Sequence, residues 1–292
     1  MELYNNYWKM ILNEIPSKGL LYSDDTIIKI RPLNVQETKY LSTLCDENAV
    51  DIINEILYKC LNLTNLNFED ILLCDREYFI FWLRNNSFIQ NSGYELNYKC
   101  HECNLDFTAN VKLTDFKVKY LNNDIIKKEI YLKDAGITLK LKQPTIKELS
   151  RNNNDNEIQT FLRYIDIDKF DNDILSSFLE KLSALDYSLL KSTINEMTIG
   201  FDKDVKIYCT HCNHEENVSL LIKENGLFST VNMFEIMEGI LKIAKYTQFQ
   251  IPETMPWWEV EIAQKVAEKM SDEEQQQIDK NNGKITMKRS DL

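Results

Sequence analysis

Two short stretches of the chain alternate between apolar and polar residues, which is the pattern of a β-strand with one buried face. The first covers residues 26–31 and places Ile28 and Ile30 on one face. The second covers residues 138–142 and carries two leucines at the corresponding places. The alternation therefore predicts two half-buried strands far apart in the chain.

The same helix-start signal follows each of these strands. Pro32 ends the first strand, Asn34 can cap the next helix, and Glu37 stands at the third position after it, as a capping box requires. Pro144 and Glu148 follow the second strand in the same order, with the proline one place later. The segments TIIKIRPLNVQE and ITLKLKQPTIKE align without a gap when Glu37 is placed on Glu148. This match indicates that a strand and helix-start unit occurs twice.

A pair of cysteines in a CxxC arrangement closes each half. KCHECN carries Cys100 and Cys103, and YCTHCN carries Cys209 and Cys212 at the matching place in the second half, each pair between predicted strands. The recurring order indicates an internal duplication, with chance recurrence of common α+β patterning as the alternative. The predicted fold class is α+β: two tandem pseudo-repeats, each helical with short β-strands and a CxxC zinc-knuckle hairpin, followed by C-terminal helices.

Helical patterns account for most of the remaining chain. Residues 1–15 are predicted to form a short amphipathic helix, and a later helical stripe includes the apolar residues Phe234, Met237 and Leu241. Trp257 and its neighbour Trp258 cannot easily be buried on one helix face, so one of them is a candidate partner contact. Three units are predicted: a first half-repeat at 1–120, a second at 121–226, and a helical C-terminal extension with a frayed tail at 227–292.

The four paired cysteines match the needs of a structural zinc ion. Such an ion takes four ligands in a tetrahedron, and each CxxC pair supplies two thiolates. Cys100, Cys103, Cys209 and Cys212 therefore predict one site that closes only when the two halves meet. Four thiolates leave no position for water or substrate, which indicates that the metal stabilises the fold rather than performing catalysis.

Other interpretations of the cysteines remain open at this stage. An iron–sulfur cluster uses the same four ligands. A redox-active CxxC is a second alternative, although such a motif normally begins a helix and these pairs lie between predicted strands. The pairs could also hold no metal. His101, His211 and His214 lie beside the pairs and could replace a ligand, although a place around the ligands is favoured. The other three cysteines lie in apolar segments with helical spacing and are predicted to be small buried hydrophobic residues: Cys45, Cys60 and Cys74.

Composition and charge disfavour several classes of function. The 292 residues are 43% hydrophobic and carry a formal net charge of −12, which disfavours bulk binding to phosphate backbones. No apolar run approaches the roughly 18 residues of a membrane span, and the start MELYNNYWKM shows no secretory signal. Common catalytic and nucleotide-binding motifs are missing, so we predict neither catalytic nor cofactor-binding residues.

The order of these features resembles a known family. A lead IPSKGLLY, an alternating strand with RPL, a helix start with glutamate and a closing knuckle occur in the first half, and a second half ends in another knuckle. Over residues 14–230 this resembles the baseplate hub assembly proteins of T4-like contractile-tailed phages. The helical extension after residue 230, and the lack of Pro and Gly around the second knuckle, depart from that pattern.

The resemblance implies a non-enzymatic structural or assembly role. Its expected partners are other phage tail and baseplate hub proteins, and its expected locations are the host cytoplasm during assembly and then the baseplate of the virion tail. The resemblance carries over the four paired cysteines as metal ligands. Two other functions remain: a zinc-ribbon adaptor for nucleic acid or transcription machinery, and an enzyme with a redox or metal site. The adaptor predicts clustered basic residues at the knuckles, where acidic residues predominate.

Overall fold

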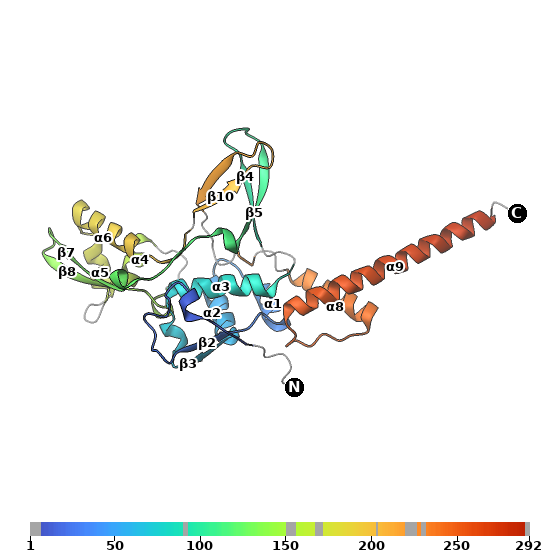
Figure 1. Ribbon diagram of the computed structural model, residues 1–292, viewed down its shortest axis with the longest axis horizontal. Coiled ribbons are helices and arrows are strands. Elements are labelled where there is room, and N and C mark those ends of the chain that lie inside the picture. Colours follow the sequence, from blue (N-terminus) through green and yellow to red (C-terminus); the bar gives the residue numbers. More distant parts are fainter. Residues whose placement is uncertain are drawn as a thin grey trace.

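The computed structural model describes residues 7–89, 93–149, 156–166, 172–202, 204–219, 227–228 and 232–289. These residues form a mixed α+β structure whose sheets are small and antiparallel (Figure 1). Two lobes lie side by side, a pair of β-hairpins rises from between them, and a long helical arm projects from one end. The predicted α+β class with C-terminal helices is confirmed.

The first lobe contains residues 7–89. Its sheet has the order β1-β2-β3, and three helices pack beside it: β1 (Trp8–Lys9), β2 (Ile27–Ile30), β3 (Leu61–Thr64), α1 (Val35–Leu41), α2 (Ala49–Cys60) and α3 (Leu73–Ser87). The predicted alternation in β2 is confirmed, because Ile28 and Ile30 are fully buried while Lys29 between them is exposed. These two side chains belong to the same apolar cluster as Leu57 of α2 and Phe79 of α3.

The predicted helix at residues 1–15 is wrong in the part that the structure describes, while residues 1–6 lie outside it. Trp8 and Lys9 form a strand that pairs with Ile30 and Lys29 of β2. A 3-10 turn at Leu12–Glu14 follows. Pairing with β2 satisfies backbone groups that an isolated short helix would leave to water, and the local apolar spacing does not reveal this distant partner.

The described residues between 121 and 199 form the second lobe, which has its own apolar core. A β-hairpin packs with three helices: β7 (Lys127–Leu132), β8 (Ile137–Lys142), α4 (Glu157–Tyr164), α5 (Asn172–Leu179) and α6 (Ala184–Met197). The alternation predicted for β8 is confirmed by the burial of Leu139 and Leu141. Phe161 of α4, Leu179 of α5 and Leu190 of α6 are buried in the same cluster.

Both lobes contain the same charged hydrogen-bonding arrangement after one of their strands, β2 in the first lobe and β8 in the second. In the first lobe the Glu37 carboxylate accepts the backbone N–H of Asn34 at 2.8 Å and a guanidinium hydrogen bond from Arg31 at 2.6 Å. This confirms the predicted capping box at α1. In the second lobe Glu148 accepts the N–H of Thr145 at 2.7 Å and the ammonium group of Lys142 at 2.7 Å. There the capping box starts only a 3-10 turn.

Each lobe also buries an aspartate carboxylate at the start of a helix. Asp75 of α3 is 0% exposed and accepts the backbone N–H of Ser17 at 2.9 Å and the hydroxyl of Tyr22 at 2.6 Å. Asp186 of α6 is 2% exposed and accepts the backbone N–H of Ala135 at 2.9 Å. Each carboxylate therefore fixes a turn of the chain against the helix that begins beside it.

A short ladder joins the two lobes. β6 (Val118–Lys119) pairs with β9 (Gly200–Phe201), and the ring of Phe201 lies 4.5 Å from that of Phe81 on α3. Gly200 has φ +115°, and an added Cβ there would make only an ordinary van der Waals contact with α3, 3.5 Å from Cβ of Cys74. Glycine suits this position because other residues avoid such a φ value.

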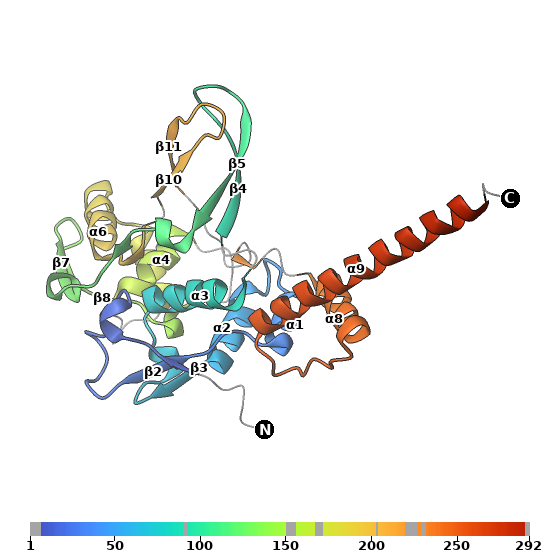
Figure 2. The ribbon, with the colours of Figure 1, turned by 45° about the vertical axis from the view of Figure 1, so that its right-hand side comes forward.

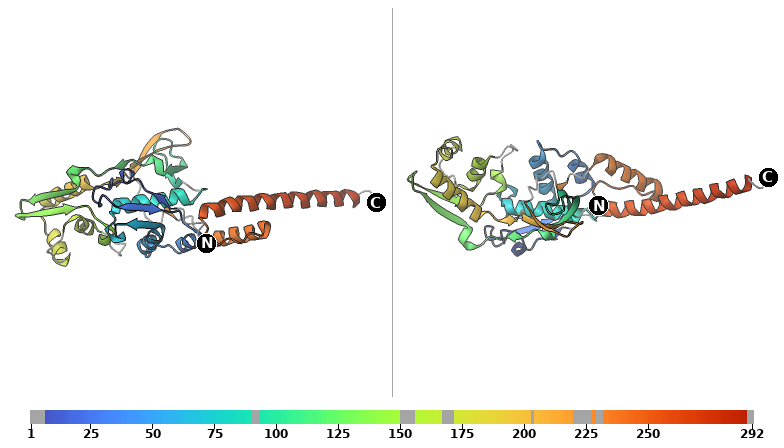
Figure 3. Two further views of the ribbon diagram at one scale, coloured as in Figure 1. Left: turned by 60° about the horizontal axis from the view of Figure 1, so that its bottom comes forward. Right: turned by 90° about the horizontal axis from the view of Figure 1, so that it is seen from above.

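The arm consists of α8 (Met233–Thr247) and α9 (Trp257–Arg289), which run side by side in the same direction. Gly239 lies against Gln264, and the hydroxyl of Ser271 donates to that of Tyr246 at 3.0 Å, so contacts advance together along both helices. The connection at 248–256 returns to the first lobe, and α9 continues beyond the end of α8 (Figure 3).

The base of α9 is built into the first lobe. The N–H of Trp257 donates to the carbonyl oxygen of Leu33 at 2.9 Å, and the N–H of Val35 donates to that of Met255 at 3.1 Å. Trp257 is 7% exposed and joins the first lobe's apolar cluster, whereas Trp258 is only partly buried. Only the outer part of the arm is free of the body.

Two truncations should therefore behave differently. Removing residues 272–292 deletes helix that lies beyond the Ser271–Tyr246 contact, so the free energy of unfolding should change by less than about 0.5 kcal/mol. Ending the chain after Gly226 also removes Trp257 and should lower it by at least about 3 kcal/mol. Chemical denaturation of both products measures this, and equal stabilities would contradict the packing of Trp257.

Among the residues that the structure describes, no helix combines the length and the apolar character needed to cross a membrane.

Candidate metal centre

Two β-hairpins stand side by side above the lobes (Figures 1 and 2). β4 (Gly93–Lys99) pairs with β5 (Asp106–Lys112), and β10 (Asp204–Tyr208) pairs with β11 (Glu215–Ser219). β10 packs against β5, and the buried side chains between and below them include Phe107, Val111, Val205 and Ile207. The fold thus brings two segments from different halves of the chain into one unit.

The turns at the tips of the two hairpins have the same backbone geometry. Asn104 and Asn213 have φ values of +59° and +58°, a left-handed conformation that asparagine tolerates better than most residues. Their N–H groups donate to the carbonyl oxygens of Cys100 and Cys209 at 3.0 and 2.9 Å. The asparagine after each cysteine pair therefore allows the turn to fold back toward its first cysteine.

The turns bring the four predicted cysteine side chains together. The sulfur atoms of Cys100, Cys103, Cys209 and Cys212 all lie within 4.8 Å of one another. Between the hairpins, Sγ of Cys100 is 3.6 Å from Sγ of Cys212, and Sγ of Cys103 is 3.7 Å from Sγ of Cys209. A tetrahedral zinc ion with bonds of about 2.3 Å separates its sulfurs by about 3.8 Å, so the spacing is compatible with a metal site.

The ionisation of these thiols is also compatible with a cation among them. Burial opposes the ionisation of Cys209, but N–H groups of Cys212 and His211 favour it and contribute to lowering its pKa to about 6. The N–H of His214 favours the thiolate of Cys212, but desolvation and the other sulfurs raise its pKa to about 12. Full ionisation of four adjacent thiols therefore calls for a positive ion between them.

The histidines beside the cysteines connect the two hairpins. His101 of the first turn donates its backbone N–H to Glu216 of β11 at 2.7 Å, and its Nδ1 lies 2.6 Å from the other carboxylate oxygen. His211 of the second turn places Nε2 3.2 Å from the carbonyl oxygen of Asp106 in β5. Each turn thus reaches the opposite hairpin through a histidine, in a reciprocal arrangement that the sequence alone did not reveal.

The carboxylate of Glu216 should support metal binding from outside the ligand set. We expect Glu216→Ala to weaken zinc binding about 10- to 100-fold, because it removes the group that orients the first turn. Competition with a chromophoric chelator measures the change. Glu215→Ala is the matched control, since Glu215 pairs with Lys206 on the same hairpin. Equal effects of the two substitutions would contradict a specific role for Glu216.

The remaining cysteines lie away from this cluster. Cys60 and Cys74 are buried, as predicted, but Cys45 is exposed, so the prediction is wrong for that residue. Cys45 follows the end of α1 in a turn, where its N–H donates to the side chain of Asn48 at 2.8 Å. The residues around Cys45 form turns between α1 and α2 rather than a continuous helix, so they do not bury its side chain.

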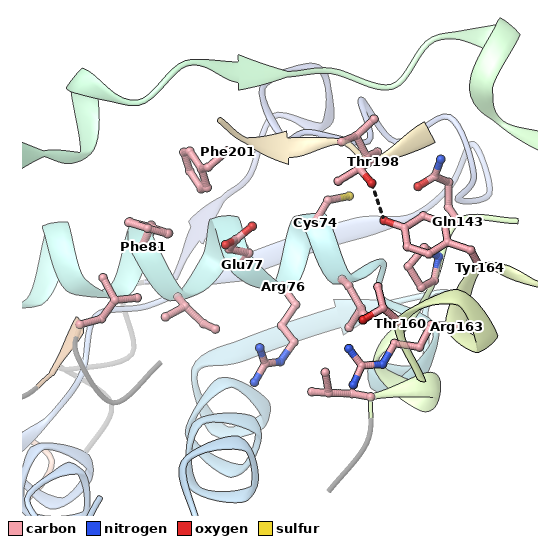
Figure 4. A pocket seen from close by; sticks show the side chains of 16 residues that line it. Cys74, Arg76, Glu77, Phe81, Gln143, Thr160, Arg163, Tyr164, Thr198 and Phe201 are labelled. Atoms are coloured by element: carbon pink, nitrogen blue, oxygen red, sulfur yellow. Dashed lines mark hydrogen bonds between the residues drawn. The ribbon is translucent and has the colours of Figure 1, made fainter. Parts of the chain in front are cut away.

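A pocket of about 330 Å³ lies where α3, α4 and β9 meet (Figure 4). The hydroxyl of Tyr164 donates to Oγ1 of Thr198 at 3.3 Å, and Cys74 also lines the pocket. Burial and the nearby charge of Asp75 raise the pKa of the Cys74 thiol well above its usual value. The thiol is therefore protonated near neutral pH and lacks the thiolate that a nucleophilic cysteine needs.

Comparison with protein families matches residues 12–224 to the T4 bacteriophage base plate protein family. The match covers more than two thirds of the chain. The chain belongs to this family of T4-like phage baseplate proteins. The second lobe, both hairpins and the first lobe from Leu12 onward fall within the matched residues, whereas β1, α8 and α9 lie outside them. Comparisons with curated proteins and with solved structures gave no match.

Proposed function

We propose that this baseplate protein is a non-enzymatic structural or assembly component of the central hub, held together by one zinc ion on Cys100, Cys103, Cys209 and Cys212. The observation that carries the proposal is the convergence of four sulfurs from two distant hairpins in a member of a baseplate family. A metal at that point links the two halves of the chain through its coordinate bonds.

Zinc is the ion that the donor set favours. Four thiolates suit zinc or an iron–sulfur centre, and a full set of four leaves no open position for a reacting molecule. The spacing of about one tetrahedral edge between opposite sulfurs fits a single ion better than a cluster of several. Elemental analysis of the purified chain should give about one zinc and little iron per molecule.

We also propose that the two halves are pseudo-repeats with limits near 1–120 and 121–226, followed by the extension at 227–292. Three pairs of contacts support this. The Arg31–Glu37 and Lys142–Glu148 ion pairs occur at aligned positions of the two halves. The buried Asp75 and Asp186 are aligned in the same register. The Cys100–Cys212 and Cys103–Cys209 sulfur contacts exchange with each other when the two halves are aligned, which supports an approximate twofold relation through the sulfurs.

The adaptor function is less well supported by the surface around the turns. Nucleic-acid binding needs free basic side chains to contact phosphates. Lys206, on β10, is instead paired with Glu215. Glu102 and Asp106 add exposed negative charge close to the first turn. We therefore propose other tail and hub proteins as the partners, with assembly in the host cytoplasm and a final place in the virion baseplate.

Quantitative mass spectrometry of purified phage particles tests the proposal. A few copies per particle, in constant ratio to other hub proteins, would support a structural component. Presence in complexes with hub proteins in infected-cell lysate, together with absence from particles, would support an assembly factor. Association with polymerase or with nuclease-sensitive complexes would contradict both and favour the adaptor. A phage carrying Cys100→Ser is the comparison that tests whether zinc is needed for incorporation.

A further inference from the structure

The outer face of α8 carries an apolar stripe that the described part of the chain does not cover. Phe234, Met237 and Leu241 are 75%, 41% and 64% exposed. Their spacing of three and four positions places them along one side of the helix. The opposite side is buried and includes Ile236 and Ile243. α8 is therefore apolar on two faces, and among the described residues only the inner face has packing partners.

The charges of α8 are divided along its length. Glu235 and Glu238 lie in its first half, and Lys242 and Lys245 lie in its second half. Within the helix, Lys242 is 3.1 Å from Glu238, so the two signs meet near the middle. Two such helices laid antiparallel bring the acidic half of each beside the basic half of the other. A parallel pair would bring like charges together.

We propose that the outer stripe of α8 is a self-association surface that pairs with α8 of a second copy in an antiparallel, twofold arrangement. In a twofold dimer the same surface of each copy forms the interface. The acidic half and the basic half of α8 make this surface complementary to itself when the two helices are antiparallel. The stripe is short, so it forms a weak dimer that dissociates on dilution. This self-association goes beyond the proposed hub function and requires none of its partners.

The position of the arm leaves room for a second copy. α8 and α9 project from the body on the side away from the second lobe (Figures 1 and 3). The base of the arm is fixed by the Trp257 and Val35 backbone hydrogen bonds, so the stripe is presented at a defined place. A second arm can approach from outside without meeting the hairpins that hold the four sulfurs.

Sedimentation equilibrium of the zinc-loaded full chain provides the first test. The mass should rise with concentration from 34.5 kDa toward twice that value. The double substitution Phe234→Glu with Leu241→Glu should raise the dimer dissociation constant at least about tenfold. Leu185→Glu is the control, because Leu185 is a 75% exposed leucine on α6. A monomer at every concentration, or equal effects of the control and the double substitution, would overturn the proposal.

Charge reversal tests the antiparallel direction. Glu235→Lys with Glu238→Lys makes α8 basic, and Lys242→Glu with Lys245→Glu makes it acidic. Each variant alone should dimerise at least about tenfold more weakly than the natural chain, and a mixture of the two should regain pairing. Circular dichroism checks that helix content is unchanged. Undiminished pairing of each variant alone, or no pairing in the mixture, would overturn the antiparallel arrangement. Because the measurement uses only purified chain, that result would leave the hub proposal intact.

Discussion

Replacing Cys100 by serine should abolish tight zinc binding and lower the free energy of unfolding by at least about 4 kcal/mol. The Sγ of Cys100 lies 3.6 Å from that of Cys212 on the other hairpin, so a hydroxyl there removes one edge of the ligand set. The three remaining thiolates come from both halves of the chain. Both halves should therefore lose stability together.

Hydrogen exchange resolves where the stability is lost. Amides at 93–112 and at 204–219 should both exchange faster in Cys100→Ser, although only the first segment carries the substitution. Chelator should produce the same pattern in the natural chain, and added zinc should reverse it there alone. Cys45→Ser is the control, since Cys45 is exposed and outside the sulfur cluster. If residues 204–219 kept full protection and one zinc stayed bound, the shared site would be ruled out.

The features that the sequence predicted well depend on residues close together in the chain. The alternation in β2 and β8 is read from neighbouring residues, and the Asn34–Glu37 capping box spans one helical turn. The four cysteines are an exception, because their partners lie far apart. They could be grouped only because four matching thiols fill one zinc tetrahedron. Their sulfurs do converge in the structure, whereas the identity of the bound ion stays a proposal.

The features that were missed depend on partners that no local pattern reveals. Trp8 is a strand residue because it pairs with Ile30, which lies far beyond the reach of a local sequence pattern. The sequence left open which of the two adjacent tryptophans is buried. Trp257 is buried because the chain at 248–256 returns to the first lobe, which makes α8 and α9 parallel. A helical stripe shows that a helix has an apolar face, but not which distant surface covers it.

The buried carboxylate of Asp75 illustrates the same limit and leads to the second large expected effect. Asp75→Ala should lower the free energy of unfolding by about 3 kcal/mol. The substitution leaves the N–H of Ser17 without its acceptor in a fully buried place, and it also removes the acceptor of the Tyr22 hydroxyl. Urea denaturation, with the same slope for both proteins, measures the loss.

Asp75→Asn separates the hydrogen bonds from the charge. Its amide oxygen can still accept from Ser17, so it should cost less than half as much as alanine. Burial raises the pKa of the Asp75 carboxyl above 3.8, although hydrogen bonds from Ser17 and Tyr22 oppose the rise. A raised folded pKa means that the folded state holds the proton more tightly than the unfolded state. The natural chain should therefore gain stability relative to Asp75→Asn as the pH falls through that folded pKa.

Asp186→Ala is the internal comparison. Asp186 is equally buried but fixes its turn through the one N–H of Ala135, so its loss should cost about half as much as the loss of Asp75. If Asp75→Ala proved no more harmful than the substitution of an exposed aspartate such as Asp124, the Ser17 and Tyr22 contacts would not stabilise the first lobe. The attachment of residues 15–22 to α3 would then have to come from the apolar packing of Ile15 and Tyr22 and from the hydrogen bond that the N–H of Leu72 donates to the Tyr22 hydroxyl.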